Sequence, residues 1–250
     1  MDVASSKPST GSPASARFAT THWSVVVAAG RRSSPQAQQA LATLCRTYWY
    51  PLYVFIRRQG FSADESQDLT QEFFARLLER HFLAQVDQEK GRFRSFLLAA
   101  CKHFLSNEGD RARAKKRGRG RELISINVED AESRYRLEPA HELTPEKLFE
   151  RRWVLTLLDQ VLAQLRNESV RNGKQDQFNC LKDFLTGNKD ETSYREAAET
   201  LGVSEGAAKV ASHRLRKRYR ELLREEIART LNEGDSIEDE IRALFAALGN

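Results

Sequence analysis

The sequence predicts an all-α protein with two helical domains joined by a basic linker. Apolar residues recur at spacings of three and four along most of the chain, and period-two alternation is almost absent. The composition is that of a polar but foldable chain, with 40% hydrophobic and 30% charged residues. Its 250 residues are enough for one large domain or two small ones.

We divide the chain into five parts. Residues 1–19 are rich in Ser, Pro and Ala without an apolar run, and we expect a disordered tail there. Residues 20–118 form the predicted N-terminal domain, 119–143 a basic flexible linker and 144–232 the C-terminal domain. Residues 233–250 form an acidic amphipathic helix. No apolar run approaches the roughly 20 residues of a membrane span, and no secretory signal is present, so we expect a cytoplasmic protein.

The N-terminal domain should begin with a short helix over residues 22–29. A longer helix then starts at Pro35, with a kink expected at Pro51, and stops at Gly60. Its apolar positions recur at spacings of three and four, as expected for one buried face.

The next helix should begin at Ser62, which forms a capping box with Glu65. Acidic residues crowd its first turns, where the helix dipole favours them. A further helix, from about 92 to 116, alternates aromatic with basic residues and runs into the strongly basic segment 111–121. Such a pattern suits single-stranded nucleic acid, with rings stacking on bases and cations following phosphates. The alternative is that the aromatic residues are core and the basic residues are solvated.

The C-terminal domain should open at Thr144, an N-cap followed by proline at the first helical position. Residues 122–143 before it show no clear period and are interpreted as linker with a short extended piece. Further on, a capping box over 193–196, a turn at Gly202 and a second N-cap at Ser204 predict a helix-turn-helix.

The second helix of this unit should bury an apolar stripe and present a basic face to the major groove. We expect Lys209, His213 and Arg214 to reach base edges, whereas the cations that follow meet phosphates. The alternative is a solvated basic face in an ordinary helical bundle.

Three segments in this order resemble the extracytoplasmic-function group of bacterial RNA polymerase sigma factors. DESQDLTQEFFARLLE, residues 64–79, resembles the helix with which that family binds core polymerase. FRSFLLAACKHFLSNEGDRARAKKR, residues 93–117, resembles the helix that recognises and melts the −10 element. It carries Phe96 where the family commonly has Trp, and Cys101-Lys102-His103 in place of Ala-Arg-Asn. SYREAAETLGVSEGAAKVASHRLRKR, residues 193–218, resembles the helix-turn-helix that reads the −35 element.

The resemblance implies partners and site residues. The partners are core RNA polymerase, promoter DNA and an anti-sigma factor. The residues implied in polymerase binding are Asp64, Glu65, Asp68, Leu69, Gln71, Glu72 and Phe73. Those implied at the −10 element are Arg92, Phe93, Arg94, Phe96, Lys102, His103, Arg111, Arg113, Lys115, Lys116 and Arg117. Those implied at the −35 element are Ser204, Glu205, Lys209, His213, Arg214, Arg216, Lys217 and Arg218.

We expect neither an enzyme nor a cofactor. The five histidines and three cysteines have no metal-ligand spacing, and nucleotide-binding and nucleophile motifs are absent. A stand-alone helix-turn-helix regulator remains the main alternative, and a helical nuclease a third class. The acidic helix 233–250 either folds back on the basic residues 209–220 or extends the C-terminal bundle.

Overall fold

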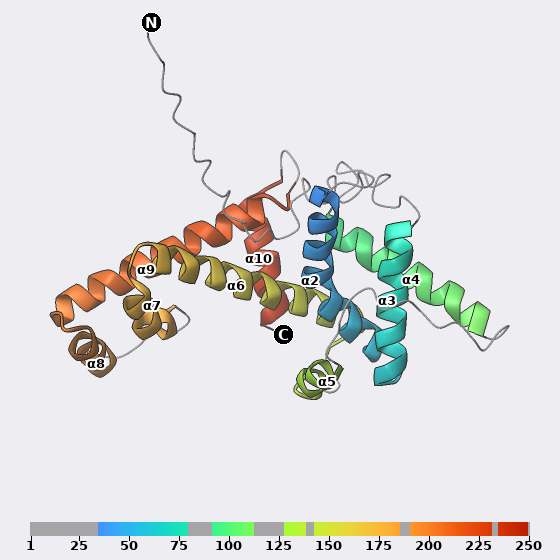
Figure 1. The fold of residues 1–250 in the computed structure, drawn as a ribbon, viewed down its shortest axis with the longest axis horizontal. Helices are drawn as coiled ribbons and strands as arrows, with labels where there is room; N and C mark the ends of the chain where they lie inside the picture. Colours follow the sequence, from blue (N-terminus) through green and yellow to red (C-terminus); the bar gives the residue numbers. More distant parts are fainter. Residues whose placement is uncertain are drawn as a thin grey trace, which may run out of the picture.

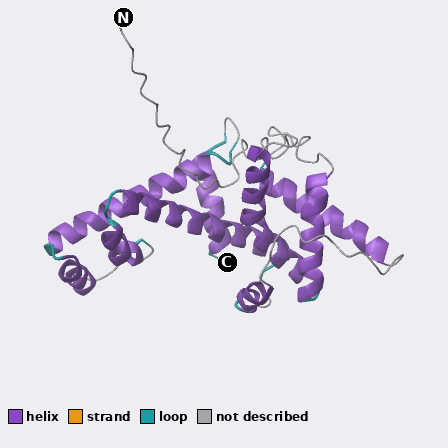
Figure 2. Ribbon diagram, viewed as in Figure 1, coloured by secondary structure: helices purple, strands orange, loops and turns teal. Residues whose placement is uncertain are grey.

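The computed structural model describes residues 35–79, 92–112, 128–138, 143–185, 191–231 and 235–249. In these ranges every regular element is helical, which confirms the all-α class for this part of the chain (Figure 2). The helix expected over residues 22–29 and the tail before it lie outside the described ranges. No helix in the described ranges is long and apolar enough to cross a membrane.

The N-terminal helices gather at one end of the molecule (Figure 1). They are α2 (Pro35–Arg58), α3 (Ala63–Glu79), α4 (Phe93–Ala112) and α5 (Val128–Arg136). Helix α2 continues through Pro51, where a kink was expected, and ends before Gly60, whose φ is +100°. The predicted capping box is confirmed, because the backbone N–H of Ser62 donates to Glu65 Oε2 at 2.9 Å and the N–H of Glu65 to Ser62 Oγ at 3.3 Å.

The remaining helices begin with the long helix α6 (Pro145–Arg171). They are α7 (Gln175–Leu181), the 3₁₀ turn η3 (Lys182–Phe184), α8 (Glu191–Leu201), α9 (Glu205–Ala228) and α10 (Ile237–Leu248). The predicted start of α6 is confirmed, since the Thr144 hydroxyl accepts the N–H of Lys147 and Pro145 occupies the first turn. Helix α8 begins at Glu191, so Ser193 lies inside its first turn and the capping box predicted over 193–196 is wrong.

The core is continuous along α6 and does not divide at the expected boundary. One apolar cluster joins Phe55 of α2 to Trp153 and Leu157 of α6 and then to Leu222 of α9. Helix α6 has 27 residues and is therefore about 40 Å long, enough to contact both ends of the molecule. Figure 1 shows α2 beside one end of α6, and α7 and α9 beside the other. The two-domain arrangement is accordingly not confirmed.

Part of the expected linker is a packed helix. Arg57 of α2 makes a two-pronged ion pair with Glu132 of α5, at 2.9 Å and 3.1 Å, and the Tyr53 hydroxyl donates to the same carboxylate at 2.9 Å. The guanidinium of Arg57 lowers the pKa of Glu132. Among the described side chains of α5, residues 131–136, Ala131 is the one buried apolar residue, so the sequence carries no helical period there. The expectation of a short extended piece over 122–143 is therefore wrong for residues 128–136.

Helix α10 extends the bundle and does not cover the middle of α9. It packs on α6 and on the C-terminal part of α9, with Leu244 in the shared core. Its ion pair with α9 joins Glu238 to Arg224, beyond the basic residues 209–220. Of the two placements considered for this helix, the structure supports an extension of the bundle.

Candidate nucleic-acid interface

The turn between α8 and α9 has the geometry that the sequence predicts. Gly202 has a φ of +63°, a conformation that glycine adopts without strain. Its N–H donates to the carbonyl of Glu199 at 3.2 Å, and the N–H of Val203 donates to the carbonyl of Ala198 at 3.0 Å. These two bonds form a Schellman motif, which satisfies the last carbonyls of α8 and directs the chain into α9.

Small side chains bring α8 and α9 close together. Ala197, Ala198 and Ala208 are all buried, so the helix backbones can approach closely. At the start of α9 the Ser204 hydroxyl accepts the N–H of Ala207 at 3.2 Å, which assigns the side chain of Ser204 to the helix cap. Glu205 pairs with Lys209 one turn later, at 2.7 Å. The two helices therefore form a helix-turn-helix with a rigid junction.

The outer face of α9 is basic in its N-terminal half. Lys209, His213, Arg214 and Lys217 are exposed, and they project from the side of the helix opposite the buried Ala208 and Ser212. Lys209 also lies 5.8 Å from the ring centroid of Tyr194 in α8. This face combines exposed cations on one straight helix, as a duplex-binding surface requires.

An apolar residue at the centre of this face was missed by sequence reasoning. Val210 is 50% exposed and lies one turn from Gly206 and from His213. In the major groove the thymine methyl is the apolar group that such a side chain can contact. Helical spacing in the sequence could have predicted this exposure, since Val210 falls on the helix face opposite the apolar stripe that includes Ala208 and Leu222.

Two of the cations implied at the −35 element bond to other parts of the protein. Arg216 donates from Nε to the carbonyl of Phe184 at 2.7 Å and from Nη2 to the hydroxyl of Tyr194 at 3.3 Å. Arg218 makes two parallel bonds to Glu168 of α6, both at 2.9 Å. Arg218 thereby lowers the pKa of Glu168, and its own pKa is raised. Both arginines therefore join α9 to neighbouring elements.

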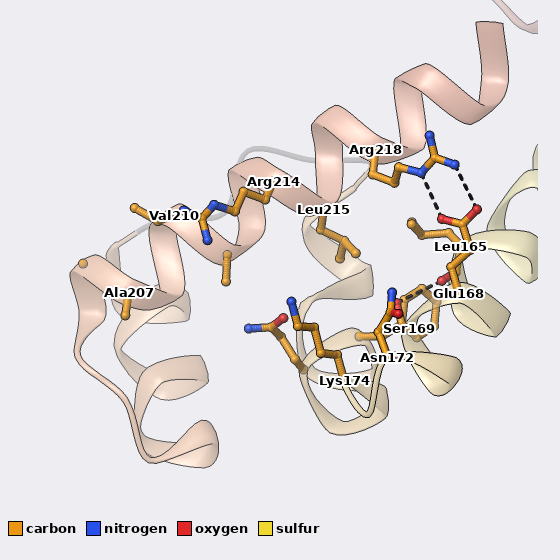
Figure 3. A pocket seen from close by; sticks show the side chains of 14 residues that line it. Leu165, Glu168, Ser169, Asn172, Lys174, Ala207, Val210, Arg214, Leu215 and Arg218 are labelled. Carbon is orange, nitrogen blue, oxygen red and sulfur yellow. Dashed lines mark hydrogen bonds and ion pairs between the residues drawn. The ribbon is translucent and has the colours of Figure 1, made fainter. Parts of the chain in front are cut away.

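A cleft of about 530 Å³ lies between α9 and the junction of α6 with α7 (Figure 3). Its apolar lining includes Leu165, Phe178 and Leu215, and the Arg218–Glu168 pair closes one end. Arg214 lines the cleft and is exposed at its mouth. Val210 and Arg214 thus border the cleft and belong to the exposed surface of α9.

The first turn of α4 buries two of the residues implied at the −10 element, Phe93 and Arg94. Phe93 is in the core, where its ring meets Tyr48 edge-on at 5.6 Å. Phe96 is half-buried and stacks on Phe93 at 5.9 Å. Arg94 is buried and pairs with Glu150 of α6 at 3.0 Å. The first turn of α4 thus packs against α2 and α6.

Further along α4, exposed and buried residues alternate around the helix. Lys102 and His103 are exposed, and Lys102 pairs with Glu146 of α6 at 2.7 Å. Cys101 is fully buried, and burial raises the pKa of its thiol to about 12. Five further residues implied at the −10 element have no described side chain. They are Arg111, Arg113, Lys115, Lys116 and Arg117.

Helix α3 separates its acidic face from its apolar face. Asp64, Glu65 and Asp68 are exposed, and the hydrogen bonds from Ser62 lower the pKa of Glu65. Three other residues of the same motif turn inward. Gln71 and Phe73 are buried, and Leu69 is half-buried.

Glu72 is half-exposed and bonds to Arg76, which also pairs with Glu108 of α4 at 2.6 Å. Through Arg76, Glu72 therefore takes part in the contact between α3 and α4. The carboxylates that can meet a partner directly are therefore concentrated in the first two turns of α3.

Comparison with known proteins gives no relative for this chain. No protein-family description, curated protein or solved structure matches it. Within the described ranges, no three His, Cys, Asp or Glu side chains are grouped so that they could hold a metal ion.

Proposed function

We propose that this protein is a sigma factor, a dissociable subunit that directs core RNA polymerase to a subset of promoters. The observation that carries the proposal is the helix-turn-helix with the exposed basic face of α9. It is supported by the order of the acidic, aromatic–basic and helix-turn-helix segments along one chain. In this role α9 reads the −35 duplex, α4 engages the −10 strand and α3 binds the polymerase.

At the −35 element, the outer face of α9 enters the major groove. Arg214 and Lys209 are the candidates for hydrogen bonds to base edges, and Lys217 follows the phosphate backbone. Val210 contacts a thymine methyl between them. Arg216 and Arg218 act indirectly, because their contacts within the protein fix the orientation of α9.

On the polymerase, the exposed carboxylates of α3 meet a basic surface. Asp64 and Asp68 lie on one side of the helix, four residues apart, and neither has a recorded ion pair among the described residues. Charge complementarity of this kind steers association and selects the partner.

A stand-alone regulator is the alternative function, and the acidic face of α3 separates the two. The double substitution Asp64→Arg and Asp68→Arg should abolish binding to core polymerase while the helix content stays unchanged. A matched control is Glu196→Arg with Glu199→Arg on α8, where both residues are also exposed. Binding is measured by co-elution with core polymerase and by fluorescence anisotropy.

The control pair should keep full affinity for the polymerase. If the α3 pair binds polymerase as well as the unaltered protein does, α3 is not the docking surface. If the unaltered protein binds duplex DNA but no polymerase, the stand-alone regulator replaces the sigma factor as the proposed function.

A further inference from the structure

The C-terminal helix α10 carries a buried carboxylate that joins two distant parts of the chain. Glu240 is 0% exposed and forms ion pairs with Arg92 and Arg94 at the start of α4, the latter at 2.6 Å. Both arginines belong to the set implied at the −10 element. We propose that α10 is a detachable latch that covers the start of α4 and keeps these two cations from single-stranded DNA. This inference rests on the proposed function of α4.

Arg94 has its positive charge fully matched while α10 is in place. Its side chain is 5% exposed, pairs with both Glu150 and Glu240, and lies with its guanidinium 4.6 Å from the centroid of the Trp153 ring. A phosphate cannot reach this guanidinium without displacing a carboxylate. Since Glu150 belongs to α6 itself and Glu240 to α10, only Glu240 can move away from Arg94 without a change in α6.

Helix α10 is attached to the bundle through the buried Leu244 and through four half-buried apolar residues, Ile237, Ile241, Ala247 and Leu248, that pack against the core, whereas Phe245 is 52% exposed. A helix of twelve residues is marginal by itself in water, so α10 loses its structure when it leaves the bundle. A buried ion pair also costs desolvation that its attraction only partly offsets, and the two guanidiniums can recover that cost on phosphates.

One of the acidic residues in the first turn of α10 contacts α4. This turn of α10 contains Glu238, Asp239 and Glu240, and of these only Glu240 is buried. Glu238 pairs with Arg224 at the exposed end of α9. The two glutamates therefore offer a matched comparison, because both form ion pairs and only one contacts α4.

The proposal is tested with two variants of the full-length protein, Glu240→Gln and the control Glu238→Gln. The probe is a fluorescein-labelled single-stranded oligonucleotide of mixed sequence, and the dissociation constant is measured by anisotropy over a range of salt concentrations.

We expect severalfold tighter binding by Glu240→Gln and no change for Glu238→Gln. Arg92 is the cation that Glu240→Gln frees, because Arg94 keeps Glu150 as a partner, so the dependence of log K on log salt should steepen by about 0.7, the value for one phosphate contact on a single strand. Glu240→Gln leaves Arg94 paired with Glu150, so the variant is expected to fold, as a circular dichroism melt will check.

A measurement on the unaltered protein is independent of these variants. Amide hydrogen exchange in residues 237–248 should become faster when the oligonucleotide is saturating. Unchanged affinity and salt dependence in the folded Glu240→Gln variant, or unchanged protection of α10, would overturn the latch. Failure of the proposed function is distinguishable, because it appears as absent transcription with core polymerase whatever the affinity for the oligonucleotide.

Discussion

Neighbouring cations on α9 differ in exposure and in partners, as Lys217 and Arg218 illustrate. Lys217 is 72% exposed and its only recorded ion pair among the described residues, with Glu221, is 4.0 Å long. Arg218, in contrast, donates two hydrogen bonds to the carboxylate of Glu168. Sequence alone describes both residues as cations of one helix. Because a helix turns by 100° per residue, the two side chains face different surroundings, and these surroundings decide their contacts.

Arg218→Ala should lower stability, whereas Lys217→Ala should change DNA binding. Loss of the partly exposed pair with Glu168 is expected to cost about 1 kcal/mol of unfolding free energy. Lys217→Ala should leave stability within about 0.5 kcal/mol and reduce the salt dependence of duplex binding by about 0.9. Chemical denaturation and anisotropy measure the two effects, and equal behaviour of the variants would contradict these assignments.

The pH dependence of the Arg218→Ala effect has a defined sign. The pKa of Glu168 is lowered by Arg218 in the folded protein. The pair therefore contributes stability above the ordinary glutamate pKa of 4.5, and this contribution is lost as the pH falls through the lowered value. The stability difference between the unaltered protein and Arg218→Ala should shrink below that pH, and a constant difference would exclude the ion pair as its cause.

Val210 can be tested against one chemical group on the DNA. If its side chain contacts a thymine methyl, Val210→Ala weakens binding to a selected duplex, and replacing that thymine with deoxyuridine weakens it equally. The two changes combined should cost little more than either alone, since both remove the same contact. Additive losses would show that Val210 and the methyl do not meet.

At the scale of elements, the junction of α8 and α9 depends on one backbone conformation. A Cβ at Gly202 would meet nothing within 4 Å, so the cost of a side chain there is backbone strain alone. Gly202→Ala should destabilise the protein by about 1 kcal/mol. Gly206, which also has open space but lies within α9, is the control, and Gly206→Ala should be neutral or stabilising by up to about 1 kcal/mol. Thermal unfolding separates the two, and similar shifts would refute the argument from strain.

Local signals in the sequence predicted most of the helices and the helix-turn-helix. Ser62, Thr144 and Ser204 cap helices as expected, and Gly202 has the expected positive φ. These features depend on residues a few positions apart, which makes them readable from one sequence. Helix α5 was missed because its stability comes from Glu132 meeting Arg57, a contact between residues 75 positions apart.

At the scale of the molecule, α6 makes one core out of what the sequence divides into two domains. Leu157 lies near the middle of α6 and is 1% exposed. Leu157→Ala should cost roughly 2–5 kcal/mol and destabilise α2 and α9 together. Calorimetry should give one transition, and hydrogen exchange should report the same loss in both helices. Two transitions, with α9 unaffected, would support independent domains.

Pairing over long distances in the chain also decides which site residues are accessible. The pattern of α4 predicted an interface at its start, but Glu150 and Glu240 reach Arg94 from two other helices. Sequence periodicity cannot predict such contacts, because they join elements whose relative placement is set by the whole core. The exposed faces of α3 and α9 were easier to predict, because helical spacing alone decides which residues share one face.

The most direct test of the proposed function is run-off transcription. Bacterial core polymerase is combined with this protein on a pool of genomic fragments. We predict discrete transcripts that depend on the protein, that disappear with Asp64→Arg and Asp68→Arg, and whose start sites reveal shared −10 and −35 sequences. An absence of transcripts, together with a polymerase-independent shift of duplex DNA, would contradict the sigma-factor proposal and favour a stand-alone regulator.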